Sequence, residues 1–385
     1  MSVKTLLRRM LALSIGLVAA ATLGEAMLRT LVGPPRPIGV PYFRDVDGTR
    51  FDVDAASAEA VRRGLFQSLP PEQTPRPRFR FAPGSRFFIC YDDAPTLHAD
   101  WLDDRGCVEV RINRFGLRER ESITPDNKAA GERRILCLGD SFTFGWGVPE
   151  ERCWVRMLED DLRTTHGDVR TVNCGLSGTL TVDECWRGLE TRFGVFRPDV
   201  VIVSIYLNDL IPSHGLCIID QPAPSGLLLY DYLRLCAGRD PLDLDPEVDW
   251  VARALSVPEQ AGLEWGVYGP DKPFAGMWSQ GAPQRALVAM RDWARDHNCL
   301  LMTVLWPFLQ GLGPAAHYPF TRLHDMVTAF CEEQGIAALD LLPSLAREPM
   351  ASLWVTPFDK HANPHAQQLV LPAIAAFVRA HLPVH

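Results

Sequence analysis

The chain has 385 residues, of which 47% are hydrophobic and 22% are charged, as is typical of a globular protein with one large core or two modest domains. Its net charge of -8 argues against a nucleic-acid-binding surface. None of the ten cysteines lies in a Cys-x-x-Cys pair, so neither a zinc site of that kind nor a thioredoxin-type motif is indicated.

The N-terminus combines a basic start with an apolar run. Residues 1–9 contain one lysine and two arginines, and residues 10–24 contain no charge. The basic flank predicts that residues 1–9 stay in the cytoplasm and that the rest of the chain is exported. Residues 10–28 are just long enough to span a bilayer if Glu25 reaches the interface. We favour a signal anchor here, with a cleaved signal peptide or a buried helix as the alternatives.

Two short regions precede the main domain. Residues 29–77 are rich in Pro, Arg and Asp without a clear period, which indicates a linker. Residues 78–130 form a small β-rich lead-in, with strands expected at 78–88 and at 107–113, where the pattern alternates with period two. Two cysteine pairs could form disulfides in an oxidising compartment, Cys90 with Cys107 and Cys217 with Cys236.

From residue 131 to the C-terminus, apolar strands alternate with helical patterns. We expect strands at 133–138, 169–173, 199–205, 300–306 and 336–342, and helices at 182–193, 284–296, 321–333 and from 364 onward. The strand at 199–205 is apolar enough to be covered on both faces. This order predicts a parallel five-stranded sheet with helices on both faces, which is an α/β/α fold.

Residues 211–282 interrupt this alternation and are long for a connection. The segment contains an apolar helical stretch at 227–235 and several aromatic residues, namely Trp250, Trp265, Tyr268 and Trp278. We expect an inserted cap that packs on the domain. The alternative is a substrate wall or lid beside the active site, in contact with the membrane.

The strongest chemical signal follows the first strand of this domain. Gly139-Asp140-Ser141 comes directly after residues 133–138 and precedes a helical pattern. Ligands of open α/β sheets bind beyond the carboxyl ends of the strands. A serine at this point is either a helix N-cap or a nucleophile.

A polar loop near the C-terminus offers partners for that serine. Asp359 and His361 stand just before Asn363 and Pro364, which suit the N-cap and the first position of a helix. A turn of this kind lets the carboxylate reach one imidazole nitrogen while the other stays free, as a serine nucleophile requires. A solvated loop histidine is the alternative, and His365 is an alternative base.

Taken together, the motifs Gly139-Asp-Ser141, Gly175, Asn208-Asp209 and Asp359-x-His361 resemble the SGNH/GDSL hydrolase superfamily. The resemblance covers roughly residues 131 to 385 without the insertion. It implies a flavodoxin-like three-layer fold and a serine esterase that acts through an acyl-serine intermediate. The family usually has Gly two residues before the Asn, where this chain has Tyr206.

The resemblance also implies roles for individual residues. Ser141 would be the nucleophile, His361 the base and Asp359 the acid that orients the base. The backbone N–H groups of Ser141 and Gly175 and the side-chain amide of Asn208 would form the oxyanion hole. The neighbouring carboxylates Asp140 and Asp209 are expected to brace their turns through backbone hydrogen bonds.

These observations lead to one function hypothesis and two rivals. The chain is expected to be a single-pass protein of the cell membrane, held by its N-terminal helix, with its catalytic domain on the extracytoplasmic (periplasmic) side. Its substrate would be an O-acylated glycan or lipid, and no cofactor, metal or nucleic-acid partner is implied. The rivals are an O-acyltransferase that uses the same site and a catalytically silent binding or assembly module.

Overall fold

The computed structural model describes most of the chain in two compact units, Met1–Val40 with Ile219–Val248, and Pro41–Ile218 with Asp249–His385. The residues described are 3–32, 41–52, 61–70, 79–91, 100–119, 123–176, 181–210, 226–236, 278, 281–314, 318, 320–356 and 359–382. Most of the predicted insertion, including Trp250, Trp265 and Tyr268, lies outside these residues.

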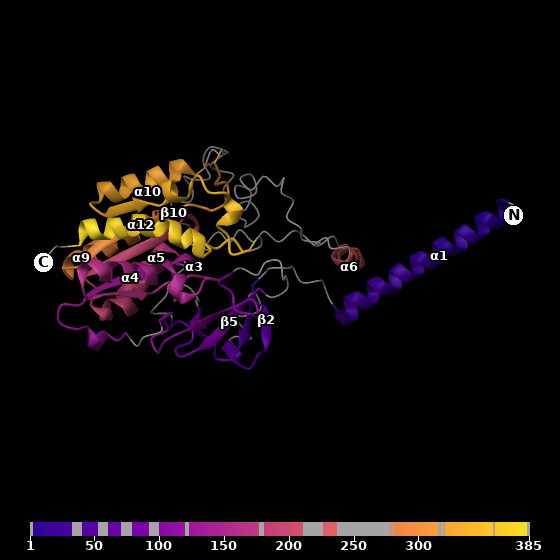
Figure 1. Cartoon of the computed structure of the whole chain (residues 1–385), viewed down its shortest axis with the longest axis horizontal. Helices are drawn as coiled ribbons and strands as arrows, with labels where there is room; N and C mark the ends of the chain where they lie inside the picture. The colour runs from indigo at the N-terminus through magenta and orange to yellow at the C-terminus, as the bar shows by residue number, and fades with distance from the viewer. Residues whose placement is uncertain are drawn as a thin grey trace. The chain divides into compact units, whose positions relative to one another are not determined.

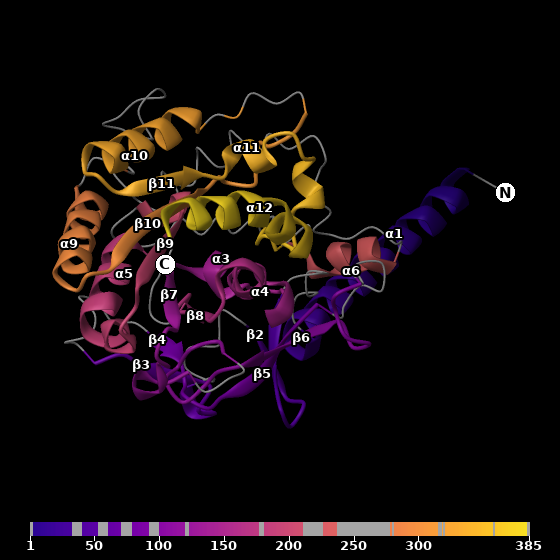
Figure 2. The same cartoon turned by 60° about the vertical axis from the view of Figure 1, so that its left-hand side comes forward.

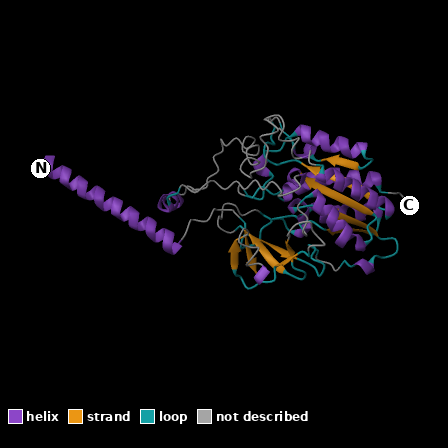
Figure 3. Cartoon of the chain, turned by 180° about the vertical axis from the view of Figure 1, so that it is seen from behind, coloured by secondary structure: helices purple, strands orange, loops and turns teal. Residues whose placement is uncertain are grey.

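A parallel five-stranded sheet forms the centre of the larger unit. Its strands, drawn orange in Figure 3, are β7 (Arg133–Leu138), β8 (Val169–Asn173), β9 (Val200–Tyr206), β10 (Leu300–Trp306) and β11 (Ala337–Asp340). The spatial order β11-β10-β9-β7-β8 is the flavodoxin-like order, so the predicted fold class is confirmed. Because the chain crosses from β8 to β9 on the other side of β7, the order reverses between β7 and β9. That point is where open α/β sheets place their ligands.

Helices cover both faces of this sheet, as Figure 2 shows. The main ones are α4 (Trp154–His166), α5 (Val182–Gly188), α9 (Ala282–Asp296), α10 (Thr321–Glu333) and α12 (Pro364–His381). Helix α4 packs against α12, and α5 packs against α9. The shorter helical elements are η4 (Pro125–Asn127), α3 (Ser141–Phe144), η5 (Glu150–Arg152), η6 (Leu189–Phe193), η7 (Gly194–Phe196), η8 (Leu207–Leu210), α11 (Leu342–Leu345) and η10 (Met350–Ser352).

A second, antiparallel sheet precedes the first in the chain and has the order β2-β1-β5-β6. Its strands are β1 (Tyr42–Asp45), β2 (Arg50–Asp52), β5 (Arg86–Cys90) and β6 (Cys107–Arg111), and β3 (Phe66–Ser68) pairs with β4 (Phe79–Phe81) beside them. The prediction that residues 29–77 are a linker is therefore wrong where the strands β1, β2 and β3 lie. These strands are three or four residues long, and β1 pairs with β5, more than forty positions away, so no local period marks them.

The β-rich part and the main domain share a hydrophobic core. Phe43, Phe87 and Tyr91 from the antiparallel sheet pack in one cluster with Phe144 and Trp146, which follow the first strand of the main domain. Phe81 stacks on Phe144 with ring centroids 5.0 Å apart. The lead-in is thus continuous with the region around Ser141.

The predicted Cys90–Cys107 disulfide is present and joins β5 to β6. Cys236 is a free and exposed thiol, so the second candidate pair is not formed, and its partner Cys217 lies outside the described residues. Among the free cysteines, Cys137 and Cys174 are fully buried, and Cys299 is partly buried.

The smaller unit contains α1 (Val3–Met27), η1 (Leu28–Val32) and α6 (Leu228–Cys236), labelled in Figure 1 except for η1. Residues Val3–Val32 form one helix long and apolar enough to cross a membrane, judged by length and composition. Glu25, the acidic residue in this run, pairs with Arg29 and accepts hydrogen bonds from the first two backbone N–H groups of α6, at 3.1 and 2.7 Å. The predicted helix at 227–235 is confirmed, and its N-terminus stabilises the negative charge of this carboxylate.

Candidate active site

The turn after β7 places Ser141 at the switch point of the sheet. Gly139 passes so close to its neighbours that a Cβ atom would lie 2.2 Å from Thr143 Oγ1 and 2.8 Å from the Ser204 carbonyl oxygen. Asp140 caps α3, because its Oδ1 accepts the Phe142 N–H at 2.9 Å. Ser141 is therefore the first residue of α3 and not its N-cap, and the helix-cap interpretation of this serine is wrong.

The loop before α12 holds the second part of the site in a fixed shape. Trp354 and Ala362 form an isolated antiparallel bridge, and the Val355 N–H donates to the His361 carbonyl at 3.0 Å. Asn363 caps α12 as predicted, since its side-chain oxygen accepts the Ala366 N–H at 3.0 Å. Its side-chain amide also donates to two carbonyls of the same loop, those of Ser352 and Trp354. Asp359 and His361 are thus held from both ends of the loop.

The structure brings Ser141, His361 and Asp359 together in one hydrogen-bonded series. His361 Nε2 lies 2.9 Å from Ser141 Oγ, and His361 Nδ1 is hydrogen-bonded to Asp359 Oδ1. With the Nδ1 proton donated to the carboxylate, Nε2 is left as the acceptor for the serine hydroxyl proton. This arrangement can activate a hydroxyl group for nucleophilic attack.

Asp359 is 4% exposed, and each of its oxygens has two donors. Oδ1 accepts from the ring and from the backbone N–H of His361. Oδ2 accepts from the Tyr91 hydroxyl at 2.6 Å and from Trp146 Nε1 at 3.0 Å. Neither Tyr91 nor Trp146 was identified from the sequence. Nothing local marks the tyrosine, which lies 268 positions from the aspartate in another sheet.

Burial and charge act in opposite directions on this pair. Burial raises the pKa of Asp359, but the charge of His361 and the hydrogen bonds from His361 and Tyr91 outweigh it and hold the pKa below its usual value. Burial lowers the pKa of His361, and the charge and hydrogen bond of Asp359 outweigh that effect and raise the pKa above 6.5. The buried carboxylate therefore stays ionised and stabilises an imidazolium beside it.

The carboxylates Asp140 and Asp209 brace their turns, as predicted. Asp140 accepts from Phe142, and Asp209 Oδ2 accepts the Tyr206 N–H at 3.0 Å, which closes the turn after β9. Burial raises the pKa of Asp140 to about 6, although the Phe142 N–H and the charge of His361 act in the opposite direction. Ser141 Oγ lies 3.4 Å from Asp140 Oδ2, a longer contact than the one to His361.

The structure does not support the predicted oxyanion role of Gly175. Its N–H donates to the side-chain oxygen of Asn173 at 3.0 Å, so this hydrogen is already engaged within the protein. The glycine is required for packing, because a Cβ atom here would lie 2.3 Å from the Phe144 nitrogen. A turn glycine after a strand looks the same in sequence whether it donates to a ligand or admits a neighbouring backbone.

Asn208 follows β9, next to the carboxyl end of β7, and belongs to η8. Its side chain lies outside the described part of the structure. Tyr206, at the position where the family usually has Gly, stacks on Phe142 of the nucleophile helix with centroids 4.0 Å apart. The tyrosine that stands in place of the family's usual glycine therefore packs against helix α3.

A buried arginine of the β-rich lead-in, Arg118, has a structural role at this site. Arg118 is 2% exposed and donates to the carbonyls of Phe144, Gly145 and Val148, at 2.8 Å for the first and 2.6 Å for the last. These carbonyls belong to the turn that ends α3. The arginine therefore fixes the C-terminal end of helix α3, because it donates to backbone carbonyls that have no donor within the helix.

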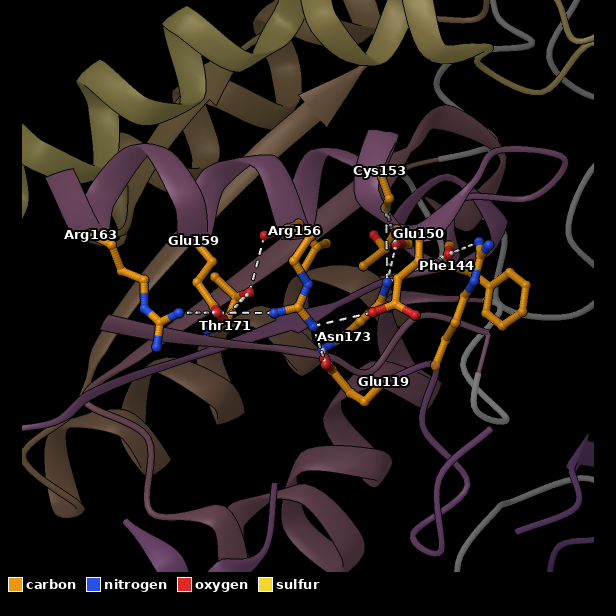
Figure 4. A network of polar contacts seen from close by, with 12 residues as sticks. Glu119, Phe144, Glu150, Cys153, Arg156, Glu159, Arg163, Thr171 and Asn173 are labelled. Atoms are coloured by element: carbon orange, nitrogen blue, oxygen red, sulfur yellow. Dashed lines mark hydrogen bonds and ion pairs between the residues drawn. The ribbon is translucent and has the colours of Figure 1, made fainter. Parts of the chain in front are cut away.

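A buried ion network fixes the helix and strand behind the nucleophile turn. Figure 4 shows Arg156 of α4 between Glu119 and Glu159, with Arg163 on the far side of Glu159. Glu159 accepts the Thr171 N–H at 2.8 Å, and Glu119 accepts the Asn173 N–H at 2.7 Å. Asn173 in turn donates its side-chain amide to the Thr143 carbonyl. Strand β8 is thereby joined to helix α4 through Glu159, which is paired with Arg156, and to helix α3 through the neutral amide of Asn173.

His365, the alternative base, lies elsewhere. Its Nε2 is 3.8 Å from Glu348, and the side chain is half exposed. Among the residues that the structure describes, no group of three or more His, Cys, Asp or Glu side chains is arranged to hold a metal ion. The site described above is thus built from Ser141, His361 and Asp359.

Comparison with known proteins places this region in a known sequence family. A model of the GDSL-like lipase/acylhydrolase family matches residues 137–369. An arylesterase from Vibrio mimicus is 33% identical over 76 residues, which are 20% of this chain and 38% of that protein.

Solved structures of esterases are more distantly similar. TesA is 16% identical, with a TM-score of 0.39, and the match covers 65% of this chain and all of that one. An acetylxylan esterase from Geobacillus stearothermophilus is 13% identical, with a TM-score of 0.39, over 65% of this chain and 96% of that one. A two-domain esterase active on acetylated mannans is 14% identical, with a TM-score of 0.36, and the match covers 65% of this chain and 49% of that one.

Proposed function

Because the chain belongs to the GDSL-like lipase/acylhydrolase family, we propose that it is a serine esterase whose nucleophile is Ser141. The observation that carries the proposal is the 2.9 Å contact between His361 Nε2 and Ser141 Oγ, with the other imidazole nitrogen bonded to Asp359. A serine with a base on its hydroxyl and an acid behind the base has the parts that acyl transfer needs.

The proposed reaction has two halves. Ser141 Oγ attacks the ester carbonyl carbon while its proton passes to His361 Nε2, and Asp359 stabilises the imidazolium that forms. The alcohol leaves with that proton, and an acyl-serine remains. A water molecule then attacks the acyl carbon while His361 accepts its proton, so that the acid is released and the serine is restored.

The carbonyl oxygen carries negative charge in both halves and needs fixed donors. We assign this task to the Ser141 N–H at the start of α3 and to the side-chain amide of Asn208. Loss of one such donor typically costs on the order of 10²–10³ in rate. Gly175 is not included, because its N–H donates to Asn173.

The proposed substrate is an O-acylated glycan or lipid outside the cytoplasm, with the enzyme held in the cell membrane by a single N-terminal helix. The apolar helix Val3–Val32, with its basic N-terminal residues, supports the anchor. The Cys90–Cys107 disulfide supports an oxidising and therefore extracytoplasmic location, since such bonds rarely persist in the cytosol. The pairing of Glu25 with Arg29 and with the start of α6 reduces the cost of a carboxylate near the membrane.

Turnover of a small ester by the full chain tests the proposal. Ser141→Ala is expected to reduce hydrolysis of p-nitrophenyl acetate to the rate of buffer alone. Ser344→Ala, in the short helix α11, is the matched control and should leave turnover unchanged. If folded wild-type protein shows no turnover, or if Ser141→Ala retains it, the esterase assignment fails.

The same assay separates hydrolysis from transfer to a sugar. With a glycan acceptor present, an esterase releases the free acid and leaves the acceptor unmodified. An O-acyltransferase would instead yield acylated glycan at the expense of free acid, which mass spectrometry of the acceptor detects.

A further inference from the structure

Tyr91 belongs to neither the parallel sheet nor the segment that matches the family model, yet its hydroxyl reaches the site. It directly follows β5 of the antiparallel sheet, whereas the family match begins at residue 137. Its side chain is 1% exposed, and its oxygen lies 2.6 Å from Asp359 Oδ2. We propose that Tyr91 is a positioning residue, supplied by the β-rich lead-in, that holds the Asp359 carboxylate in the orientation that His361 requires.

The geometry assigns separate tasks to the two carboxylate oxygens. Oδ1 faces the imidazole, and Oδ2 is held by Tyr91 and by Trp146 Nε1. Rotation of the carboxylate about its Cβ–Cγ bond would break both Oδ2 hydrogen bonds inside a buried site. The two donors therefore keep Oδ1 directed at His361 and also spread the negative charge that the imidazole experiences.

The surroundings of Tyr91 are built to keep its hydroxyl in place. A Cβ atom on Gly147 would lie 2.5 Å from the Tyr91 oxygen, so this glycine leaves the space that the hydroxyl occupies. The Tyr91 N–H donates to the Gly106 carbonyl at 2.8 Å, and the preceding residue, Cys90, is tied to Cys107 by the disulfide. The tyrosine is thus fixed by its backbone, by its covalent neighbour and by packing.

The inference rests on the proposed function, because a positioning residue has meaning only if Asp359 and His361 act in catalysis. It adds that the family domain of this chain is completed by a residue from outside it. The lead-in then positions the Asp359 carboxylate in addition to packing against Phe144 and Trp146.

Tyr91→Phe in the full-length chain removes the hydroxyl and keeps the ring. The expected result is a fall in kcat of about 10-fold, the size of effect that follows from loss of one hydrogen bond to a charged group, with KM within about 2-fold of the wild type. The acid limb of the pH–rate profile is expected to move to higher pH. In this variant Trp146 still holds the Asp359 carboxylate. The negative charge of the carboxylate is then shared with one donor fewer, so it stabilises the imidazolium of His361 more strongly.

Tyr42→Phe is the matched control. Tyr42 is also 1% exposed, lies in the neighbouring strand β1 and loses a hydrogen bond from Arg44 at 3.0 Å, but it packs with Cys90 and Cys107 in a different cluster from that of Tyr91. It should lower stability without moving the acid limb. Trp146→Phe removes the other Oδ2 donor and should move the limb as Tyr91→Phe does, which keeps the test available if Tyr91→Phe does not fold.

The acid limb decides the outcome. The proposal is supported if the acid limb moves along the pH axis in Tyr91→Phe and stays in place in Tyr42→Phe. A shift of the limb to lower pH would mean that the Asp359 carboxylate has moved away from the imidazole. If the limb of Tyr91→Phe superimposes on that of the wild type, or if both tyrosine variants move it equally, Tyr91 only fills space and the inference is overturned. Turnover by Ser141→Ala in the same assay would instead refute the proposed function itself.

Discussion

Nε2 of His361 lies 2.9 Å from Oγ of Ser141, although 220 positions separate the two residues in the chain. The serine comes from the turn after β7, and the histidine from the loop that ends at the N-cap of α12. The parallel sheet brings these two segments together at the edge where its strands end.

Asp359→Asn is expected to lower kcat by about 10²–10⁴-fold, because an amide cannot hold the imidazole in the tautomer that leaves Nε2 free to accept a proton. Asp359 also raises the pKa of His361, so its loss should move the acid limb of residual activity to lower pH. Steady-state kinetics across pH measures both effects. Unchanged kcat in a folded variant would remove Asp359 from the mechanism.

The wild-type enzyme is expected to lose activity on the acid side through a pKa above 6.5. The base must be neutral to accept the serine proton, and Asp359 raises the pKa of His361 above that value. Activity should therefore rise with pH through this pKa and reach a plateau above it, which kcat/KM measured between pH 5 and pH 9 records. A midpoint below 6.5 would mean that burial, which lowers the pKa of His361, outweighs the charge and hydrogen bond of Asp359.

Gly175→Ala is expected to destabilise the fold by about 3 kcal/mol or more, because the new Cβ atom would meet the backbone of α3 at 2.3 Å. The control is Gly131→Ala, because Gly131 has a left-handed φ of 84° but open space where a Cβ atom would lie. This variant should lose about 1–2 kcal/mol of folding stability, from backbone strain alone. Denaturant unfolding of both variants gives the comparison. Equal costs would show that close approach at Gly175 is not the dominant effect.

Arg118→Met is expected to cost about 3–5 kcal/mol, since it leaves the carbonyls of Phe144, Gly145 and Val148 without this donor in a buried turn. Arg111→Met removes an exposed arginine that pairs with Glu109, and it should leave the free energy of unfolding close to that of the wild type, because water screens an exposed ion pair. Chemical denaturation measures the difference. A small effect at Arg118 would mean that the nucleophile turn holds its shape without it.

The sheet of the main domain was predictable because its strands carry strong local patterns. Strand β9 is apolar at six of its seven residues, all except Ser204, and the observed β10 coincides with the predicted strand at 300–306. Strands β1 and β2 were missed because four and three residues cannot establish a period, and the second partner of β1, strand β5, is remote. Local pattern therefore identified the parallel sheet and the strands β5 and β6 of the antiparallel sheet, but not β1 and β2.

The residues of the candidate site likewise fall into those that a local motif predicts and those that only the fold reveals. Ser141, Asp359 and His361 stand in short motifs beside a strand end or a helix start, and the structure brings all three together. For Gly175, the sequence does not reveal that the N–H donates to the side chain of Asn173, and the oxyanion role stays a prediction that this contact does not support. Arg118 and Tyr91 carry no local sign of burial, since an arginine or a tyrosine reads as a surface residue until the fold encloses it.

Labelling with a serine-directed fluorophosphonate, followed by peptide mapping, measures the central claim most directly. The account predicts one phosphonylated peptide, modified at Ser141, in the folded wild-type chain. It also predicts that labelling is at least about 100-fold slower in His361→Ala, since general-base catalysis is typically worth 10²–10⁴-fold, and at the wild-type rate in His365→Ala. A folded wild-type protein that is not labelled at Ser141, or a His361→Ala variant that is labelled as fast as the wild type, would contradict it.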